Sequence, residues 1–178
     1  KISRFPLTHV LFEACAPALN SGQQMAGSAT PESTLFLVSF AVHMMQRRPI
    51  IGANWKMNTD LESGMLLAGD IAEGINASLC CDVVVYPPFP YFRAIEKVIS
   101  QSAVMLGAQN IWHEENGAFT GEVSGAMLND LGVTSVLVGH SERRHILGDT
   151  DNLIAKKVES SLRQGFQVVL CVGETLDQ

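Results

Sequence analysis

One stretch of the sequence decides the fold, Val136-Leu137-Val138-Gly139-His140-Ser141-Glu142-Arg143-Arg144. It begins as a short valine-rich run, which is typical of a strand buried in a parallel sheet. Such a strand places His140 at the carboxyl rim of the sheet, where α/β proteins bind ligands. His140 can exchange protons near neutral pH, and a helix beginning at Ser141 would point its free N–H groups and positive dipole end at a ligand. The alternative is a rim histidine with a purely structural hydrogen bond.

Strand and helix alternate on both sides of this stretch. Apolar runs predict five strands, and helical spacing predicts the segments between them: strands at 50–54, 82–86, 104–108, 135–138 and 167–172, helices at 61–75, 91–100, 124–131 and 151–164. Because no hairpin signal interrupts the series, the connections must be crossovers in a parallel sheet. An open doubly wound sheet and a closed barrel both fit this α/β pattern.

Residues 1–48 differ from the rest of the chain. They contain three prolines and a patch rich in Ser, Gly and Gln, which predicts a linker, disorder or a leader. The apolar run at 34–45 is too short to span a bilayer, and Arg47 and Arg48 follow it, the reverse of a secretory signal. We therefore expect an extension at 1–48, a folded part at 49–178 and a cytoplasmic protein, with organellar targeting as the alternative.

Composition excludes several classes of function. A formal net charge of −6 argues against nucleic acid or an anionic membrane as the main partner. The four cysteines form no C-x-x-C pair, and Cys171 lies in an apolar run, so we interpret it as a core residue rather than a nucleophile. Neither a dinucleotide-binding nor a P-loop motif is present, and the histidines lack metal-ligand spacing. We expect neither a cofactor nor a metal.

Polar side chains follow the predicted strands, and barrel active sites are built at such strand ends. These are Asn54 and Lys56, Gln109 and Asn110, His140 and Glu142, and Glu174. Lys56 is a candidate anion ligand or else a solvated lysine, and Asn54 either orients Lys56 or caps the turn. Arg143 and Arg144 are expected to form ion pairs. Phe119, in the glycine-flanked loop 117–122, either marks a partner surface or folds back on its own barrel.

Five segments together resemble the triosephosphate isomerase family: Asn54-Trp55-Lys56-Met57-Asn58, Gly107-Ala108-Gln109-Asn110, Gly117-Ala118-Phe119-Thr120-Gly121-Glu122, Gly139-His140-Ser141-Glu142-Arg143-Arg144 and Cys171-Val172-Gly173-Glu174-Thr175. The resemblance covers residues 49–178. It implies a (β/α)8 barrel, incomplete here with about five of eight β/α units, since the whole fold typically needs about 250 residues. It also implies a cytoplasmic glycolytic homodimer that interconverts dihydroxyacetone phosphate and glyceraldehyde 3-phosphate without a cofactor.

The resemblance assigns roles to individual residues. Lys56 would bind substrate and neutralise its charge, and Asn54 would position Lys56 and contact substrate. His140 would be a neutral electrophile, a role for which this family is itself the standard example. Glu142 would be a further catalytic residue near Lys56, and Thr120, with Phe119 in the same loop, would contact the partner subunit.

The sequence also departs from the family pattern. The family's catalytic base, a glutamate after the sixth strand, is not among residues 49–178, nor are its lid and later phosphate-binding loops; Glu174 is not that base. Five strands would leave the first and fifth as open edges. We therefore expect the 178-residue polypeptide to be inactive by itself. The alternative is a non-catalytic half-barrel that acts through protein contacts.

Overall fold

The computed structural model describes residues 48–75 and 80–173, and expectations for residues 1–47 and for Glu174 lie outside this part. Its five strands pair in parallel and in chain order: β1 (Ile50–Asn54), β2 (Asp82–Tyr86), β3 (Val104–Ala108), β4 (Ser135–Val138) and β5 (Gln167–Leu170). The predicted α/β class with a parallel sheet is confirmed. Within the described residues, β1 and β5 each have one neighbouring strand, so they are the two edges.

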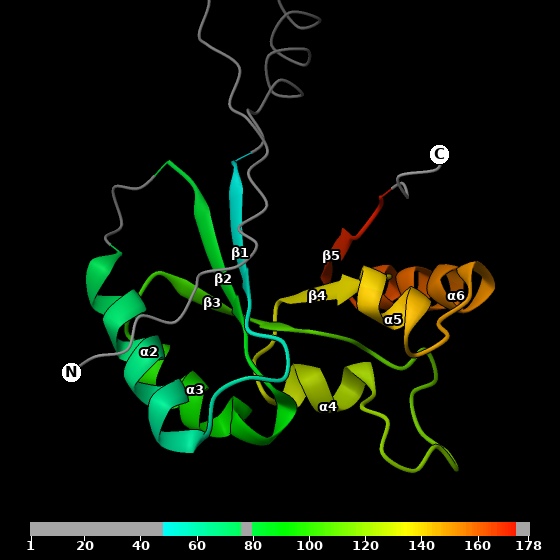
Figure 1. Cartoon of the computed structure of the whole chain (residues 1–178), viewed down its shortest axis with the longest axis horizontal. Coiled ribbons are helices and arrows are strands. Elements are labelled where there is room, and N and C mark those ends of the chain that lie inside the picture. The colour runs from blue at the N-terminus through cyan, green and yellow to red at the C-terminus, as the bar shows by residue number, and fades with distance from the viewer. Residues whose placement is uncertain (1–47, 76–79, 174–178) are drawn as a thin grey trace, which may run out of the picture.

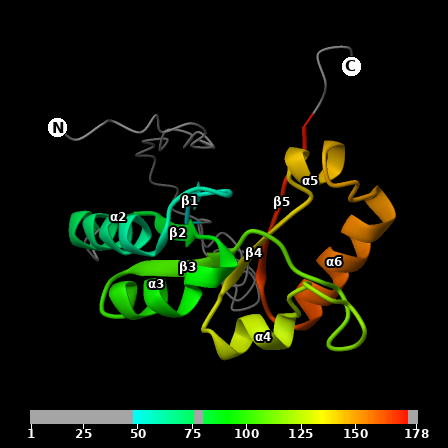
Figure 2. The same ribbon diagram turned by 60° about the horizontal axis from the view of Figure 1, so that its bottom comes forward.

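Helices fill the connections between the strands. They are α2 (Leu61–Gly74), α3 (Phe92–Ile99) preceded by the 3-10 turn η1 (Phe89–Tyr91), α4 (Gly125–Asp130), α5 (Ser141–His145) and α6 (Asp151–Arg163). Helices α2 and α3 lie side by side at the β1–β3 end of the sheet, and α5 and α6 lie beside β4 and β5 (Figures 1 and 2). In the described part of the chain, no helix is long and apolar enough to cross a membrane.

Most element boundaries agree with the sequence prediction. Strands β1 to β4 begin and end where their apolar runs do, and Asp60 caps α2 by accepting a hydrogen bond from the Ser63 amide at 2.9 Å. The fifth strand is shorter than predicted: its register with β4 ends at Leu170, a last backbone bond runs from the Cys171 amide to the Val138 carbonyl at 2.9 Å, and Val172 is 83% exposed. An apolar run sustains a strand only where a neighbouring chain receives its hydrogen bonds.

The two faces of the sheet are covered differently. Alternate strand residues, such as Val85 and Val136, pack in one large cluster with helical residues such as Ile95 and Ile154. The opposite face carries a smaller cluster built around Val84, Tyr86 and Leu137, which contains no helical residue. Doubly wound sheets have helices on both faces, whereas a barrel has them only outside. Strand order and one-sided helices therefore identify a five-stranded partial (β/α) barrel.

Tyr86 fills the inner face between two strands that carry glycine. Its ring lies over Gly107 of β3, where an added Cβ would overlap the ring, and over Gly52 of β1, where a Cβ would lie 3.2 Å from Cε2. The buried hydroxyl of Tyr86 is 2.9 Å from the Ser135 hydroxyl. Burial raises the pKa of Tyr86, so the phenol stays neutral in the physiological range.

We predict that Gly107→Ala destabilises the fold by about 1–3 kcal/mol, because the new methyl group overpacks the space that Tyr86 occupies. Urea unfolding followed by circular dichroism measures the change. Gly74→Ala is the matched control, since a Cβ there meets nothing within 4 Å. A Gly107→Ala variant as stable as the Gly74→Ala variant would contradict this account of the inner face.

Candidate active site

Three predicted site residues come together at the carboxyl edge of the sheet. Lys56 follows β1, and its Nζ donates a hydrogen bond to Glu142 Oε1 at 2.7 Å, across 86 positions of sequence. The second carboxylate oxygen of Glu142 lies 3.6 Å from His140 Nδ1. Lys56 is therefore paired rather than merely solvated. A cation, a carboxylate and an imidazole share one half-buried site, and such groups can bind an anion and exchange protons.

The backbone of Lys56 is held in an unusual conformation. Its φ of +56° is in the left-handed region, which costs a residue other than glycine about 1–3 kcal/mol. Asn54 Oδ1 accepts a hydrogen bond from the Lys56 amide at 2.9 Å. Gln109 Nε2 donates to the Lys56 carbonyl at 2.8 Å and to the Tyr86 carbonyl at 2.9 Å. Side chains from the ends of β1 and β3 thus hold both polar backbone groups of Lys56.

His140 is the N-cap residue of α5. Its Nδ1 accepts a hydrogen bond from the Glu142 amide at 3.2 Å, so the ring in this arrangement carries its proton on Nε2. The sequence predicted a helix at Ser141 that would aim its dipole at a ligand. Helix α5 has only five residues, and its Glu142 amide is taken by His140, so the dipole contribution is smaller than expected.

Arg144 ties the end of β4 to the chain that follows β5. Its Nε donates to the Gly139 carbonyl at 2.6 Å, and its guanidinium packs so closely on Gly139 (φ +75°) that only glycine fits there without strain. A second guanidinium nitrogen reaches the Cys171 carbonyl at 3.4 Å, and a third pairs with Asp151 at 2.6 Å. The predicted ion pair of Arg144 is confirmed. Burial raises the pKa of the Cys171 thiol, which agrees with a packing rather than a nucleophilic role.

Asp149, Arg143 and Lys157 form an ionic cluster that joins α5 to α6. Asp149 accepts two hydrogen bonds from the Arg143 guanidinium, at 2.8 and 3.1 Å, and one from Lys157 Nζ at 2.6 Å. Burial disfavours the Asp149 anion, but these bonds outweigh it and hold the pKa of the carboxyl below its usual value. Burial also lowers the pKa of Lys157, against the opposing effect of Asp149.

The ion pair of Arg143 was predicted, but the partners of the cluster were not. Lys156 and Lys157 are neighbours in the sequence, yet Lys156 is exposed and Lys157 is fully enclosed. The helical spacing on α6 was the available signal: Lys157 lies on the same face as the buried Ile154, three residues earlier, whereas Lys156 lies on the opposite face.

Phe119 and Thr120 lie in the loop between β3 and α4. Phe119 packs against Trp112, with ring centroids 5.1 Å apart, yet 40% of it remains exposed. The ring therefore folds back in part on its own barrel, and its role as a partner surface is not tested. Thr120 is exposed in the same loop. No partner chain is present, so their contact with a second subunit stays a prediction.

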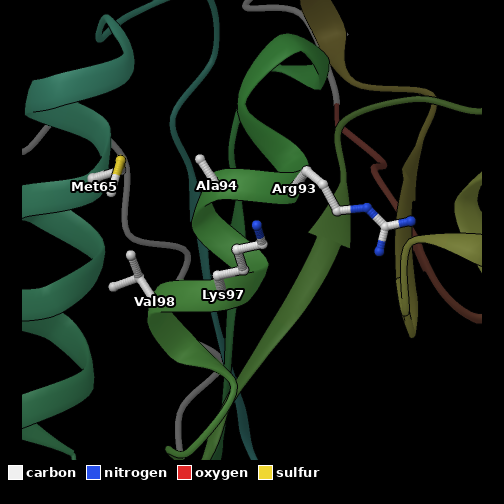
Figure 3. A pocket seen from close by; sticks show the side chains of 5 residues that line it. All are labelled: Met65, Arg93, Ala94, Lys97 and Val98. Atoms are coloured by element: carbon white, nitrogen blue, oxygen red, sulfur yellow. The ribbon is translucent and has the colours of Figure 1, made fainter.

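Two other features of the described residues bear on ligands. A shallow depression of about 410 Å³ lies between α2 and α3. It is lined by Met65, Arg93, Ala94, Lys97 and Val98 (Figure 3). None of the strand-end residues lines it. Residues 48–75 and 80–173 contain no group of three or more His, Cys, Asp or Glu side chains placed to hold a metal ion.

Sheet order, one-sided helices and polar strand ends define this chain as part of a (β/α)8 barrel with its candidate site at the carboxyl edge. The family model for triosephosphate isomerase matches residues 49–178, so the chain belongs to the triosephosphate isomerase family. The isomerase of Rhodopirellula baltica is 45% identical over 134 residues, 75% of this chain and 53% of that protein. That of Magnetococcus marinus is 46% identical over 133 residues, 74% of this chain and 52% of that protein. The chain thus spans about half the length of these curated relatives.

We predict that Asp149→Asn costs on the order of 3–5 kcal/mol near neutral pH, because the fully buried Lys157 and the partly buried Arg143 would face a neutral amide. The Asp149 pKa is depressed in the folded state, so its contribution is present above the unfolded pKa of about 3.9 and is lost as the pH falls through the folded pKa. The stability gap between the native chain and the variant should therefore narrow below about pH 4.

Urea unfolding at a series of pH values measures this gap. Asp151→Asn is the control, since Asp151 is also paired with an arginine but its side chain is 93% exposed. A gap for Asp149→Asn that does not change with pH would show that the ionisation of Asp149 contributes nothing.

Proposed function

We propose that this chain supplies the first five β/α units of a triosephosphate isomerase, which interconverts dihydroxyacetone phosphate and glyceraldehyde 3-phosphate through an enediolate. The observation that supports the proposal is the cluster of Lys56, His140 and Glu142, joined at 2.7 and 3.6 Å at the carboxyl edge of the sheet. Family membership provides the substrate class. The reaction belongs to glycolysis and gluconeogenesis, and we propose a cytoplasmic location.

The proposed roles follow from the charge that the reaction develops. Removal of a proton beside a carbonyl group places negative charge on oxygen, and groups that stabilise this charge in the transition state accelerate the reaction. Lys56 supplies a cation next to that oxygen, and Asn54 holds the Lys56 backbone and contacts substrate. His140 has Nδ1 occupied as an acceptor, so its Nε2–H can donate to a substrate oxygen. This family is itself the standard example of such a neutral histidine.

Glu142 is the remaining catalytic candidate in this half of the site. Its carboxylate pairs with Lys56 and lies beside the imidazole of His140. It can therefore hold the Lys56 ammonium in place and exchange a proton with it, whereas His140 Nδ1 is already occupied by the Glu142 amide. We do not assign it the part of the general base, which in this family comes from the sixth strand.

The remaining parts of the activity belong to the complementary half of the barrel. The resemblance assigns the base, the lid and the phosphate-binding loops to later β/α units than the five described. General acid–base catalysis contributes about a hundred- to ten-thousand-fold. We therefore propose that turnover requires those units together with this chain. A homodimer would form through the β3–α4 loop, with Thr120 and Phe119 at the contact, and no cofactor would be needed.

One observation favours a second candidate function. Apolar side chains near the β5 edge are exposed, with Leu170 at 45% and Val172 at 83%. A non-catalytic half-barrel that binds another protein through its sheet edges would present such residues.

The discriminating experiment is complementation. We predict no turnover by the purified 178-residue polypeptide, expressed in a host that lacks its own isomerase. Addition of a separately expressed C-terminal segment of the Rhodopirellula baltica isomerase, which supplies the missing strands, should restore turnover. In that complex, Lys56→Ala and His140→Gln should each lower kcat/KM by about a hundredfold or more.

The exposed residue Lys156 provides the control, because Lys156→Ala should leave the complex as active as before. Turnover by the polypeptide alone would refute the predicted dependence on the second half. A stable complex whose residual activity is indifferent to Lys56 and His140 would refute the isomerase assignment and favour the binding module.

A further inference from the structure

A fully enclosed lysine lies outside the candidate site. Lys157 of α6 has 0% of its side chain exposed, and its Nζ donates to Asp149 Oδ2 at 2.6 Å and to Asn110 Oδ1 at 2.9 Å. The Trp112 ring is 5.9 Å from the same nitrogen. Lysine is almost never fully buried unless its charge is paired, because removing an ammonium from water costs several kcal/mol. The partners of this ammonium are therefore fixed in place by the energetic need to keep it paired.

The first partner of Lys157, Asp149, connects it to the part of the site that contains His140 and Glu142. Asp149 binds Arg143 through two side-chain hydrogen bonds, and its own amide donates to the Arg143 carbonyl at 2.8 Å. Arg143 belongs to α5, directly after Glu142. A helix of five residues has little stability of its own, so its position depends on such anchors. Asp149 thus holds the short helix whose N-cap is His140.

The second partner of Lys157, Asn110, connects it to the part of the site that contains Lys56. Asn110 is buried, at 8% exposure, and it directly follows Gln109 at the end of β3. The Gln109 side chain donates to the carbonyl of Lys56 and so holds the strained backbone of that residue. The bond from Lys157 to Asn110 therefore fixes the segment that supports Lys56.

We propose that Lys157 is a positioning residue of the strand-end site: one buried ammonium holds both the segment that supports Lys56 and the helix that carries His140 and Glu142. The positioning of Lys56 and His140 for catalysis rests on the isomerase function proposed above, whereas the contacts of Lys157 do not depend on that function. The Lys56–Glu142 pair joins the loop after β1 to the short helix α5, so the 2.7 Å contact requires both segments to be held in position. Lys157 binds Asn110, next to the residue that supports Lys56, and Asp149, which anchors α5.

Nuclear magnetic resonance of the isotope-labelled full chain tests the proposal without turnover. The ¹⁵N shifts of the His140 ring report its tautomer and the Nδ1 hydrogen bond, and the amides of Lys56 and Gln109 report the other side. Lys157→Met should shift both sets of signals. Its matched control, Lys156→Met, removes the exposed neighbouring charge and should shift neither.

Two further variants separate the two connections. Arg143→Met leaves the Lys157–Asp149 pair whole and should shift the His140 ring more than the amides of Lys56 and Gln109. Asn110→Leu should shift the amides of Lys56 and Gln109 more than the His140 ring, since only the Lys56–Glu142 contact then carries the change across the site. These two also decide the question if Lys157→Met does not fold.

The proposal is overturned if Lys157→Met folds and leaves the His140 ring in its original tautomer and hydrogen bond. It is equally overturned if Asn110→Leu and Arg143→Met each shift the signals of both sides to the same extent, since that is the general loosening expected of a purely structural cluster. Because no outcome depends on activity, a failed complementation experiment and a failed positioning role remain distinguishable.

Discussion

The parallel pairing of strands in chain order is the constraint on which the rest of the structure depends. Every connection must return across one face of the sheet before the next strand begins, so the carboxyl ends of all five strands lie along one edge. That edge brings Lys56, which follows β1, to Glu142, which follows β4. The apolar cluster under the helices supplies the burial that maintains this arrangement, at roughly 25 cal/mol for each Å² removed from water. The polar residues at the strand ends contribute the site.

On the inner face of the sheet, side chains of the strands pack against one another without any helix. A large ring fits on this face only where the neighbouring strands carry residues without side chains, and Tyr86 is flanked by Gly52 and Gly107. Its hydroxyl, which would be costly to bury alone, is paired with Ser135. A polar group therefore lies within an apolar layer, while its raised pKa keeps it uncharged. The same strands present alternate residues to the helices outside, so one sequence pattern serves two different packing environments.

How much could be predicted from the sequence depended on whether the signal was local. Strand β4 and the N-cap Asp60 could be predicted because apolar runs and caps are properties of a few adjacent residues. The end of β5 was placed two residues too far along, since pairing with β4 rather than composition ends it. The choice of a barrel over a doubly wound sheet required the one-sided helices. At the site, Lys56 and His140 were recognisable from their motifs, whereas the two hydrogen bonds from Gln109 and the burial of Lys157 arise from contacts between distant segments.

A buried ammonium at position 157 fixes the positions of its neighbours in a way that an apolar side chain would not. Apolar packing is tolerant, since side chains of similar volume can replace one another, and it fixes strands and helices better than irregular loops. A buried ion pair adds little net stability compared with apolar residues of the same volume. It does, however, demand particular partners at particular distances. Asn110 and Asp149 both lie in loops, and the site is made of loop residues and one short helix. A contact that positions such a site must act on these segments themselves, and a fully desolvated ammonium does so because leaving it unpaired is costly.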